Sequence, residues 1–210
     1  MKKPFKKMAL ALLCAAAFQL SACTKNNNPS SDSSLSAAEK QGLLFMREEE
    51  KMAFDVYNHL YGQWGLLPFS NISQSEANHM AAVKTLLDRY QLADPAAGKT
   101  AGEFEDPVLS ALYSTLLQKG DSSDVQSLLT GALIEEVDIR DLKLWISQTT
   151  KTDLQQVFNS LMLGSRNHLR SFVSNLAARG ISYTPIYLSQ AEYDEIISSP
   201  WESGGFGRGQ

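Results

Sequence analysis

Apolar residues recur at intervals of three and four along most of this chain, which is the spacing of one face of an α-helix. The first such stripe follows Ser36-x-x-Glu39, a capping-box pattern, and it predicts a helix that runs to about Gly62. No alternation of apolar and polar residues extends far enough to indicate a strand. We therefore expect an all-α protein.

Turn signals divide the rest of the chain into five further helices. Residues 91–105 contain a proline and two glycines, and they predict a surface loop. Four of the six helices are long and amphipathic, so we expect a four-helix bundle with an extra short helix in the long connection and a short C-terminal helix. The five later helices are predicted from about Ser70 or Asn71 to the Asp94-Pro95 break, from Asp106-Pro107 to Gly120, from about Ser123 to Ser147, from about Thr152 to Arg179, and from Ser189 to Ile197.

The N-terminus has the pattern of a secretory signal peptide. Four lysines precede an apolar run from Met8 to Phe18, which is far shorter than the roughly 20 residues needed to cross a bilayer. The tetrapeptide LSAC that ends at Cys23 resembles a bacterial lipobox, and this resemblance implies that Cys23 carries a lipid. We expect a lipoprotein signal peptide over residues 1–22 and a protein anchored in the bacterial cell envelope, facing the periplasm or the cell exterior.

Composition narrows the classes of function. Removal of the signal takes away four lysines and no acidic residue, so the formal charge changes from −4 to −8, which argues against nucleic acid as a partner. Only Cys23 remains of two cysteines, so no disulfide is expected. Polar residues 23–35 predict a flexible tether, residues 36–199 suit one domain with a sizeable core, and Gly-rich residues 200–210 predict a disordered tail.

Two of the three histidines lie on apolar helix faces. His79 follows Glu76 by three residues, so the two side chains share one face of the second helix. A buried glutamate is costly unless it is paired or binds a cation. His168 lies on the apolar face of the fourth long helix. These positions favour metal binding over the alternative of a surface glutamate and an ordinary core histidine.

Two other helices carry several acidic residues each, and more than one of them could point into the bundle. On the third long helix, Glu135 and Asp138 fall near the centre of the apolar arc and Glu136 falls toward its edge, so we prefer Glu135 with Asp138. On the first helix, residues 48–50 are consecutive glutamates, each turned by about 100° from the last, so at least one points inward or nearly so. The apolar face alone favours Glu49.

These residues resemble the ligand pattern of the ferritin-like superfamily. Its bundles use a glutamate on the first helix, Glu-x-x-His on the second, a glutamate on the third and Glu-x-x-His on the fourth. The EANH motif at residues 76–79 matches the second element. On the first helix, the resemblance implies Glu50, because Ala53 and Tyr57 follow it at the expected distances, and Glu49 stays the alternative.

A closer resemblance, to an uncharacterised ferritin-like family called the domain of unknown function 2202, covers roughly residues 39–198. The family implies a fold but no established reaction. The chain departs from the superfamily pattern at Ser165, where the fourth helix should carry a glutamate, which leaves a coordination position for water, substrate or Asp138. The blocks that carry the closer resemblance are REEEKMAFDVY, SNISQSEANHMAAVKTLLDRY, GALIEEVDIRDL and GSRNHLRSF.

The resemblance implies two metal ions, iron or manganese, that perform oxidative chemistry on ferrous iron, peroxide or dioxygen, as in an oxidoreductase of the ferroxidase or peroxidase type. Iron is the expected cofactor, with manganese or zinc as alternatives. A single ion, a non-catalytic metal-binding lipoprotein and a metal-free structural or partner-binding envelope module stay open. The expected partners are the membrane, through the lipid, and metal ions; a homodimer is compatible with the sequence. The expected ligands are Glu50, Glu76, His79, Glu135 and His168, with Asp138 as a sixth.

Overall fold

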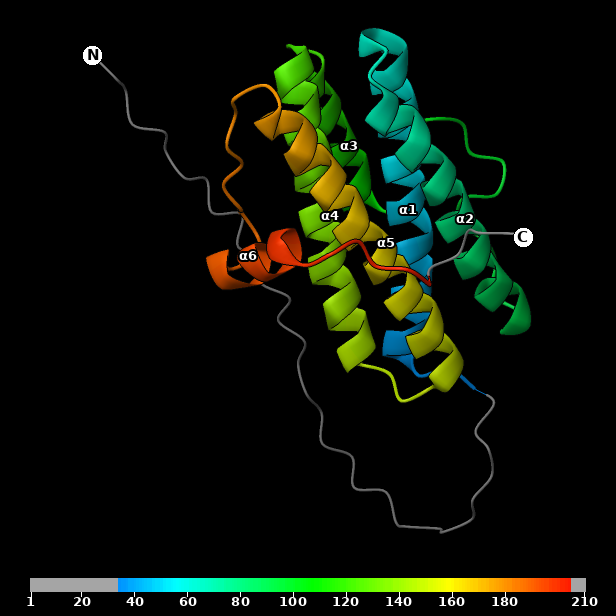
Figure 1. Ribbon diagram of the computed structural model, residues 1–210. Coiled ribbons are helices and arrows are strands. Elements are labelled where there is room, and N and C mark those ends of the chain that lie inside the picture. The colour runs from blue at the N-terminus through cyan, green and yellow to red at the C-terminus, as the bar shows by residue number, and fades with distance from the viewer. Residues whose placement is uncertain (1–33, 205–210) are drawn as a thin grey trace. The chain divides into compact units, whose positions relative to one another are not determined.

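A computed structural model describes residues 34–204, which form an all-helical bundle without strands (Figure 1). No helix in this range is long and apolar enough to span a membrane. The expected signal peptide, the lipidated Cys23, most of the tether and residues 205–210 lie outside the described residues. The helices are α1 (Ala37–Trp64), α2 (Leu67–Arg89), α3 (Pro107–Gly120), α4 (Asp124–Ser147), α5 (Thr152–Ala177) and α6 (Gln190–Ser198).

The helix ends follow the chemistry of the sequence. Ser36 and Glu39 form the predicted capping box at the start of α1, and Gly65 ends this helix in the left-handed conformation, with a φ of 65°. Asp106 caps α3 by accepting backbone N–H groups of its first turn. Ser189 caps α6 in a second capping box. The short helix within the long connection and the short C-terminal helix are thereby confirmed.

Helix α2 begins earlier than the sequence pattern predicts. It starts at Leu67 rather than at Ser70 or Asn71, and no side chain caps it. Pro68 lies in its first turn, where a missing N–H group breaks no helical hydrogen bond and the restricted φ angle suits a helix. The polar residues that indicated a start therefore lie inside the helix.

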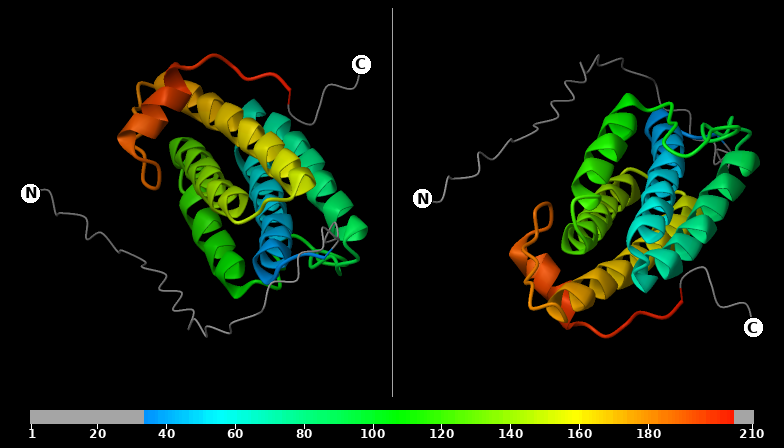
Figure 2. Two further views of the ribbon diagram at one scale, coloured as in Figure 1. Left: turned by 90° about the horizontal axis from the view of Figure 1, so that it is seen from below. Right: turned by 90° about the horizontal axis from the view of Figure 1, so that it is seen from above.

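Helices α1, α2, α4 and α5 form the bundle (Figure 2). α1 packs most extensively on α2 and α4 on α5, and contacts of α1 with α4 and of α2 with α5 join the two pairs. Gly42 of α1 meets Trp145 of α4, whereas Tyr57 meets Gly131, so α1 and α4 are antiparallel. Short turns connect α1 to α2 and α4 to α5, so α2 and α4 run in the same direction. The chain between them must cross from one end of the bundle to the other.

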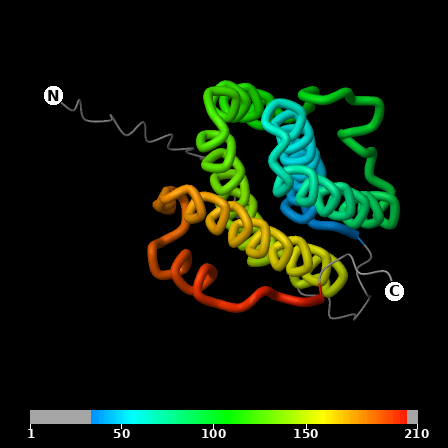
Figure 3. Tube along the Cα trace, turned by 45° about the horizontal axis from the view of Figure 1, so that its top comes forward, coloured from blue at the N-terminus to red at the C-terminus, as the bar shows by residue number. Residues whose placement is uncertain are grey.

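This crossover spans residues 90–123 and includes α3, which packs beside α1 and α4 (Figure 3). Buried charged side chains of α1 hold it in place. Glu48 accepts two backbone N–H groups at the start of α3. Lys51 Nζ donates to the Thr100 carbonyl oxygen at 2.8 Å, and Arg47 pairs with Asp94 at 3.0 Å. The polar loop is thus tied to a helix through ion pairs and backbone hydrogen bonds.

The segment after α6 returns to α5 (Figure 3). Glu202, in the stretch that the sequence assigns to the tail, accepts hydrogen bonds from Arg166 Nε at 2.7 Å and Arg170 Nη2 at 3.0 Å. Its backbone N–H donates to Asn167 at 3.0 Å. The described part of the C-terminal segment is therefore held by polar side chains of α5.

Two apolar clusters fill the bundle. One contains Tyr57, Phe69 and Phe172, and the other contains Met46 and Phe158. Buried acidic side chains and two histidines occupy the middle of the helices between these clusters. Burial of unpaired charge is costly, so the ionisable side chains of this layer must be stabilised by one another, by protons or by a bound cation.

Candidate metal centre

Two groups of metal-ligand side chains meet in the middle of the bundle. Glu50 of α1 joins Glu76 and His79 of α2 in the first group. Glu135 of α4 and His168 of α5 form the second group, again with Glu76. Within each group, one ligand atom from every residue lies within 4.8 Å of the others. The structure therefore brings five of the six predicted ligands together, and Glu76 belongs to both groups.

In the first group, His79 Nδ1 lies 2.8 Å from Glu76 Oε2 and 3.1 Å from Glu50 Oε2. The spacing of three residues places Glu76 beside His79, and the packing of α1 on α2 adds Glu50. The other ring nitrogen, Nε2, lies 3.5 Å from the Ser75 hydroxyl. Nδ1 is therefore the nitrogen that faces the carboxylates.

In the second group, His168 Nδ1 lies 3.0 Å from Glu76 Oε1 and 3.4 Å from Glu135 Oε2. Neither contact has the geometry of a hydrogen bond. The His79 and His168 rings are nearly parallel, with centroids 5.5 Å apart. The two oxygens of Glu76 thus face two different histidines, which is how a carboxylate that bridges two ions would be placed.

Gly164 makes room for the first group. A Cβ atom at this position would lie 2.6 Å from His79 Nε2. Glycine inside a helix costs about 1 kcal/mol relative to alanine, so the close approach of α5 to His79 explains its presence. Gly164 was not among the residues predicted from the sequence. The available signal was a glycine inside an amphipathic helix, four residues before His168.

Ser165, which stands where the ferritin-like pattern has a glutamate, contacts a carboxylate from the neighbouring helix. Its hydroxyl donates a hydrogen bond to Asp138 Oδ2. Asp138 Oδ1 has no hydrogen-bond partner within residues 34–204. Asp138 belongs to neither of the two groups, but it lies one turn from Glu135, and the charges of both groups act on it. A carboxylate from α4 therefore occupies the neighbourhood of the missing glutamate.

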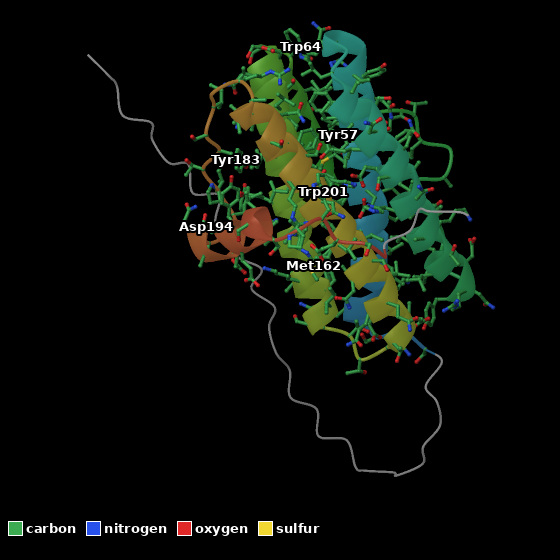
Figure 4. All side chains as sticks on the ribbon, viewed as in Figure 1. Tyr57, Trp64, Met162, Tyr183, Asp194 and Trp201 are labelled. Carbon is green, nitrogen blue, oxygen red and sulfur yellow. The ribbon has the colours of Figure 1, made fainter. Side chains whose placement is uncertain are left out.

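Tyr57 lies inside the bundle (Figure 4) and is fully buried. Its hydroxyl donates to Glu135 Oε1. Its ring packs against Phe69 and Phe172, with centroid distances of 5.9 and 5.4 Å. The side chain therefore contributes both to the aromatic core and to the orientation of the Glu135 carboxylate.

Burial and opposite charges shift the titration of these groups. Burial alone would raise the pKa of Glu76, but the charges of His168 and His79 hold it well below its ordinary value. Burial would lower the pKa of His168, but the negative charges of Glu76 and Glu135 raise it to about 9. Burial, followed by the charge of Glu135, raises the pKa of Asp138 to about 8. Without a bound cation, protons therefore balance much of the negative charge, and a metal ion would displace them.

The three consecutive glutamates of α1 are all buried, and each has different surroundings. Glu50 belongs to the first group, whereas Glu48 holds the crossover. Glu49 is only 2% exposed, belongs to neither group, and has no hydrogen-bond partner for either oxygen among the described residues. Burial, and then the charge of Asp141, raise the pKa of Glu49 well above its ordinary value. The apolar face favoured Glu49 and the ferritin-like resemblance favoured Glu50. Both side chains are buried, but only Glu50 belongs to one of the two groups of candidate ligands.

Of the adjacent residues Glu135 and Glu136, only Glu135 faces the centre. Glu136 Oε2 accepts the backbone N–H groups of Ile186 and Tyr187, both at 2.8 Å. This glutamate holds the extended segment between α5 and α6, so its role is structural.

Comparisons with known proteins give a family and a fold. The family described as "Uncharacterized protein domain (DUF2202)" matches residues 39–200. An uncharacterized protein of Methanocaldococcus jannaschii is 50% identical over 170 residues, which cover 81% of this chain and 92% of that protein. The crystal structure of the hypothetical protein MJ0754 from Methanococcus jannaschii matches this structure with a TM-score of 0.79 at 47% sequence identity. The match covers 87% of this chain and 100% of that chain. None of these descriptions names a reaction.

Proposed function

The chain belongs to the family of the uncharacterized domain DUF2202, and on that premise we propose that its bundle binds two metal ions and uses them for oxidative chemistry on ferrous iron, peroxide or dioxygen. One observation carries the proposal: the two oxygens of Glu76 face two histidines, and each histidine has a second carboxylate beside it. Carboxylates and imidazoles together suit iron, manganese and zinc.

We further propose that the bundle is of the ferritin-like type. A single long crossover between the second and third bundle helices supports this, because ferritin-like folds have one such connection. The ligand positions also support it, since α1 and α4 each supply a glutamate and α2 supplies Glu-x-x-His. Helix α5 departs from the type at Ser165 and keeps its histidine.

The residues present fit a pair of ions. Glu50 and His79 would hold one ion, Glu135 and His168 the other, and Glu76 would bridge them. Glu50 Oε1 and His168 Nδ1 are buried and have no hydrogen-bond partner in the described part of the chain. Buried polar atoms normally have partners, so atoms left in this state support direct contact with an ion. Asp138 is the sixth candidate ligand, through Oδ1.

Iron or manganese bound here would supply electrons to dioxygen or peroxide, or accept them from ferrous iron. The protein residues would set the conditions for this reaction. Tyr57 orients Glu135 through its hydrogen bond, and Gly164 leaves space for the His79 ring. The apolar clusters on both sides limit the access of water, which strengthens electrostatic interactions inside the centre.

Metal analysis of the protein purified without chelators tests this proposal. We expect two ions per chain in the wild type and loss of metal in a Glu76→Ala/His79→Ala double variant. The matched control is His59→Ala/Asp121→Ala, which removes an exposed histidine and carboxylate that contact each other at 2.8 Å. Equal metal content in the wild type and the first variant would contradict the proposal. Faster oxidation of ferrous iron by the wild type than by the first variant would support turnover.

A second candidate is a metal-free structural or partner-binding module, and two observations favour it. Ser165 lacks the charge of the expected ligand, and Glu76 already pairs with both histidines. Chelation separates the two functions. An ion that binds the native state raises the melting temperature, so an unchanged melting temperature after chelation supports the structural function. A non-catalytic metal-binding protein would lose stability on chelation but would not accelerate the oxidation of ferrous iron.

For location, we propose attachment to the cell envelope through a lipid on Cys23, which rests on the sequence pattern of residues 1–23. Growth with a labelled fatty acid tests it. The wild-type chain should take up label and partition with membranes, whereas Cys23→Ser should do neither. Equal labelling of the two chains would exclude Cys23 as the attachment point.

A further inference from the structure

A small apolar cavity lies outside the candidate centre, between α1, α3 and α4. Its volume is about 20 Å³. About 10–15 Å³ is needed to hold one water molecule, so this cavity has room for one very small molecule and is far too small for a drug-sized ligand. The side chains that line it come from the three helices and from the segment before α6: Met52, Leu112, Leu116, Leu133, Ile134, Val137 and Tyr187.

The lining of this cavity suits a guest without polar groups. All of the lining side chains except Tyr187 are hydrocarbons or a thioether, and the helical backbone groups beside them bond within their own helices. A buried water molecule normally makes two to four hydrogen bonds, which such a lining does not supply. Apolar cavities of this kind exclude water and bind apolar guests such as xenon.

The cavity has a buried floor and a more exposed rim. Leu112 and Leu133 are half-buried, and Tyr187 is 48% exposed, so these side chains form the rim. The cavity therefore faces solvent on the side of Tyr187, which is where a small molecule would enter. The floor consists of three lining residues that are at most 2% exposed: Met52, Leu116 and Ile134.

Two polar side chains of α4 hold Tyr187 at this rim. Glu136 Oε2 accepts the Tyr187 backbone N–H at 2.8 Å. The Arg140 guanidinium lies 4.7 Å from the centre of the Tyr187 ring. Glu136 is completely buried, and a hydrogen bond to a buried carboxylate is stronger than one between neutral groups. Fixed contacts, rather than a loose surface side chain, therefore define the rim.

The floor of the cavity is close to candidate ligands along two helices. Ile134 directly precedes Glu135 on α4, and Met52 follows Glu50 by two residues on α1. Consecutive Cα atoms are about 3.8 Å apart, so the backbone of α4 separates the cavity from the centre by a single residue. α1 also packs less extensively on α4 than on α2. The boundary between α1 and α4 is therefore the short way from the cavity to the centre.

We propose that this cavity binds dioxygen and supplies it to the candidate centre. The supply to the centre rests on the proposed function, whereas the binding rests only on the size and lining of the cavity. Dioxygen is apolar and diatomic. Hydrogen peroxide carries two hydroxyl groups that would lose their hydrogen bonds to water here, so the cavity discriminates against it. The oxidant is therefore dioxygen.

Dissolved dioxygen is paramagnetic and speeds the relaxation of nuclei close to it, which gives a direct test. The full-length protein is isotope-labelled in its methionine methyl groups and freed of metal by chelation. We expect dioxygen to speed relaxation of the Met52 methyl group far more than that of Met46. Met46 is the matched reference, because it is equally buried but lies in the other apolar cluster. Equal effects on the two methyl groups would overturn the proposal.

Variants of one lining residue assign the effect to this cavity. Leu112→Phe fills the cavity from α3, which carries no candidate ligand, and should abolish the selective effect on Met52. Leu67→Phe makes the same change at a leucine that is 65% exposed, and it should keep the effect. A selective effect that persists in Leu112→Phe, with its fold checked by circular dichroism, would overturn the site. If that variant does not fold, Leu112→Ala replaces it; this change enlarges the cavity and should strengthen the effect, and an unchanged effect would overturn the site.

Oxidation of ferrous iron at different dioxygen concentrations separates the two proposals. Leu112→Phe should raise the KM for dioxygen, and saturating dioxygen should restore the wild-type rate. Leu67→Phe should leave the KM unchanged. An equal KM in the wild type and Leu112→Phe would overturn the supply of dioxygen from the cavity. No oxidation of ferrous iron by the wild type would overturn the proposed function, and relaxation of Met52 would still decide whether the cavity binds dioxygen.

Discussion

The first group (Glu50, Glu76 and His79) and the second group (Glu76, Glu135 and His168) are the two halves of the candidate centre. They reach similar surroundings from different sequences. On α2, the position three residues before His79 carries Glu76, and the local helix spacing places both side chains together. On α5, the position three residues before His168 carries Ser165, whose hydroxyl donates a hydrogen bond to Asp138 of α4. Either of two packed helices can therefore place a carboxylate at the same candidate ligand position of the bundle.

The change with the largest expected effect breaks both halves at once. Glu76→Gln keeps the shape of the shared side chain and removes its charge, so we expect loss of both tightly bound ions. Elemental analysis after purification without chelators measures this loss. Glu195→Gln serves as the control for removal of a carboxylate at the surface. Retention of two ions by Glu76→Gln would refute a bridging role.

Replacing the two histidines one at a time should show whether each half of the centre binds its own ion. His79→Ala removes a nitrogen that faces Glu50, whereas His168→Ala removes one that faces Glu135. We expect each variant to lose one ion, and X-ray absorption spectra of the remaining ion should differ between the variants. Loss of both ions in each variant would mean that the halves bind metal only as a unit. Two ions in either variant would exclude that histidine as a ligand.

The Ser165–Asp138 contact tests whether a carboxylate can be exchanged between helices. Ser165→Ala removes the hydrogen bond that orients Asp138, and loss of such an orienting contact lowers metal affinity by roughly 10- to 100-fold. The exchange Ser165→Glu/Asp138→Ser moves the carboxylate to α5 and should restore the affinity. Competition with a fluorescent chelator measures both. An affinity unchanged in Ser165→Ala would place Asp138 outside the proposed pair.

Gly164 tests the spatial fit of the first half. Gly164→Ala places a Cβ atom against His79, and overpacking of this kind costs about 1–3 kcal/mol of unfolding free energy. Urea unfolding in the presence of a chelator measures it. Gly62→Ala in α1 is the matched control, because nothing lies within 4 Å of its Cβ position, and alanine there should slightly stabilise the helix. Equal stability of the two variants would contradict close contact between α5 and His79.

The smallest effect concerns pH. Folding raises the pKa of His168 from 6.5 to about 9 and that of Asp138 from 3.8 to about 8, so the metal-free folded state binds both protons more tightly than the unfolded state. The contribution of His168 to stability is complete below pH 6.5 and is lost as the pH rises through 9, while that of Asp138 is lost between pH 3.8 and 8.

Urea unfolding between pH 6 and pH 9 checks this sign. The free energy of unfolding of the metal-free protein should fall with rising pH, whereas metal affinity should rise, because the ion competes with these protons. A metal-free protein that gains stability over this range would contradict the shifts assigned to His168 and Asp138.

Local spacing in the sequence was enough to predict the helices and the Glu76–His79 pair. Apolar periodicity set the six helices, and a separation of three residues puts two side chains on one helix face whatever the rest of the chain does. The resemblance selected Glu50, whereas periodicity alone preferred Glu49. The start of α2 was misplaced because polar residues after Pro68 imitate a cap.

The tertiary structure decided everything that depends on contact between helices far apart in the sequence. Glu49 and Glu50 are both buried, but only Glu50 has a ligand atom within 4.8 Å of those of Glu76 and His79 on α2. The link between Ser165 and Asp138 joins residues 27 positions apart, and the close fit of Gly164 to His79 joins α5 to α2. Such contacts depend on the register and distance between packed helices, which helical periodicity within one segment does not contain.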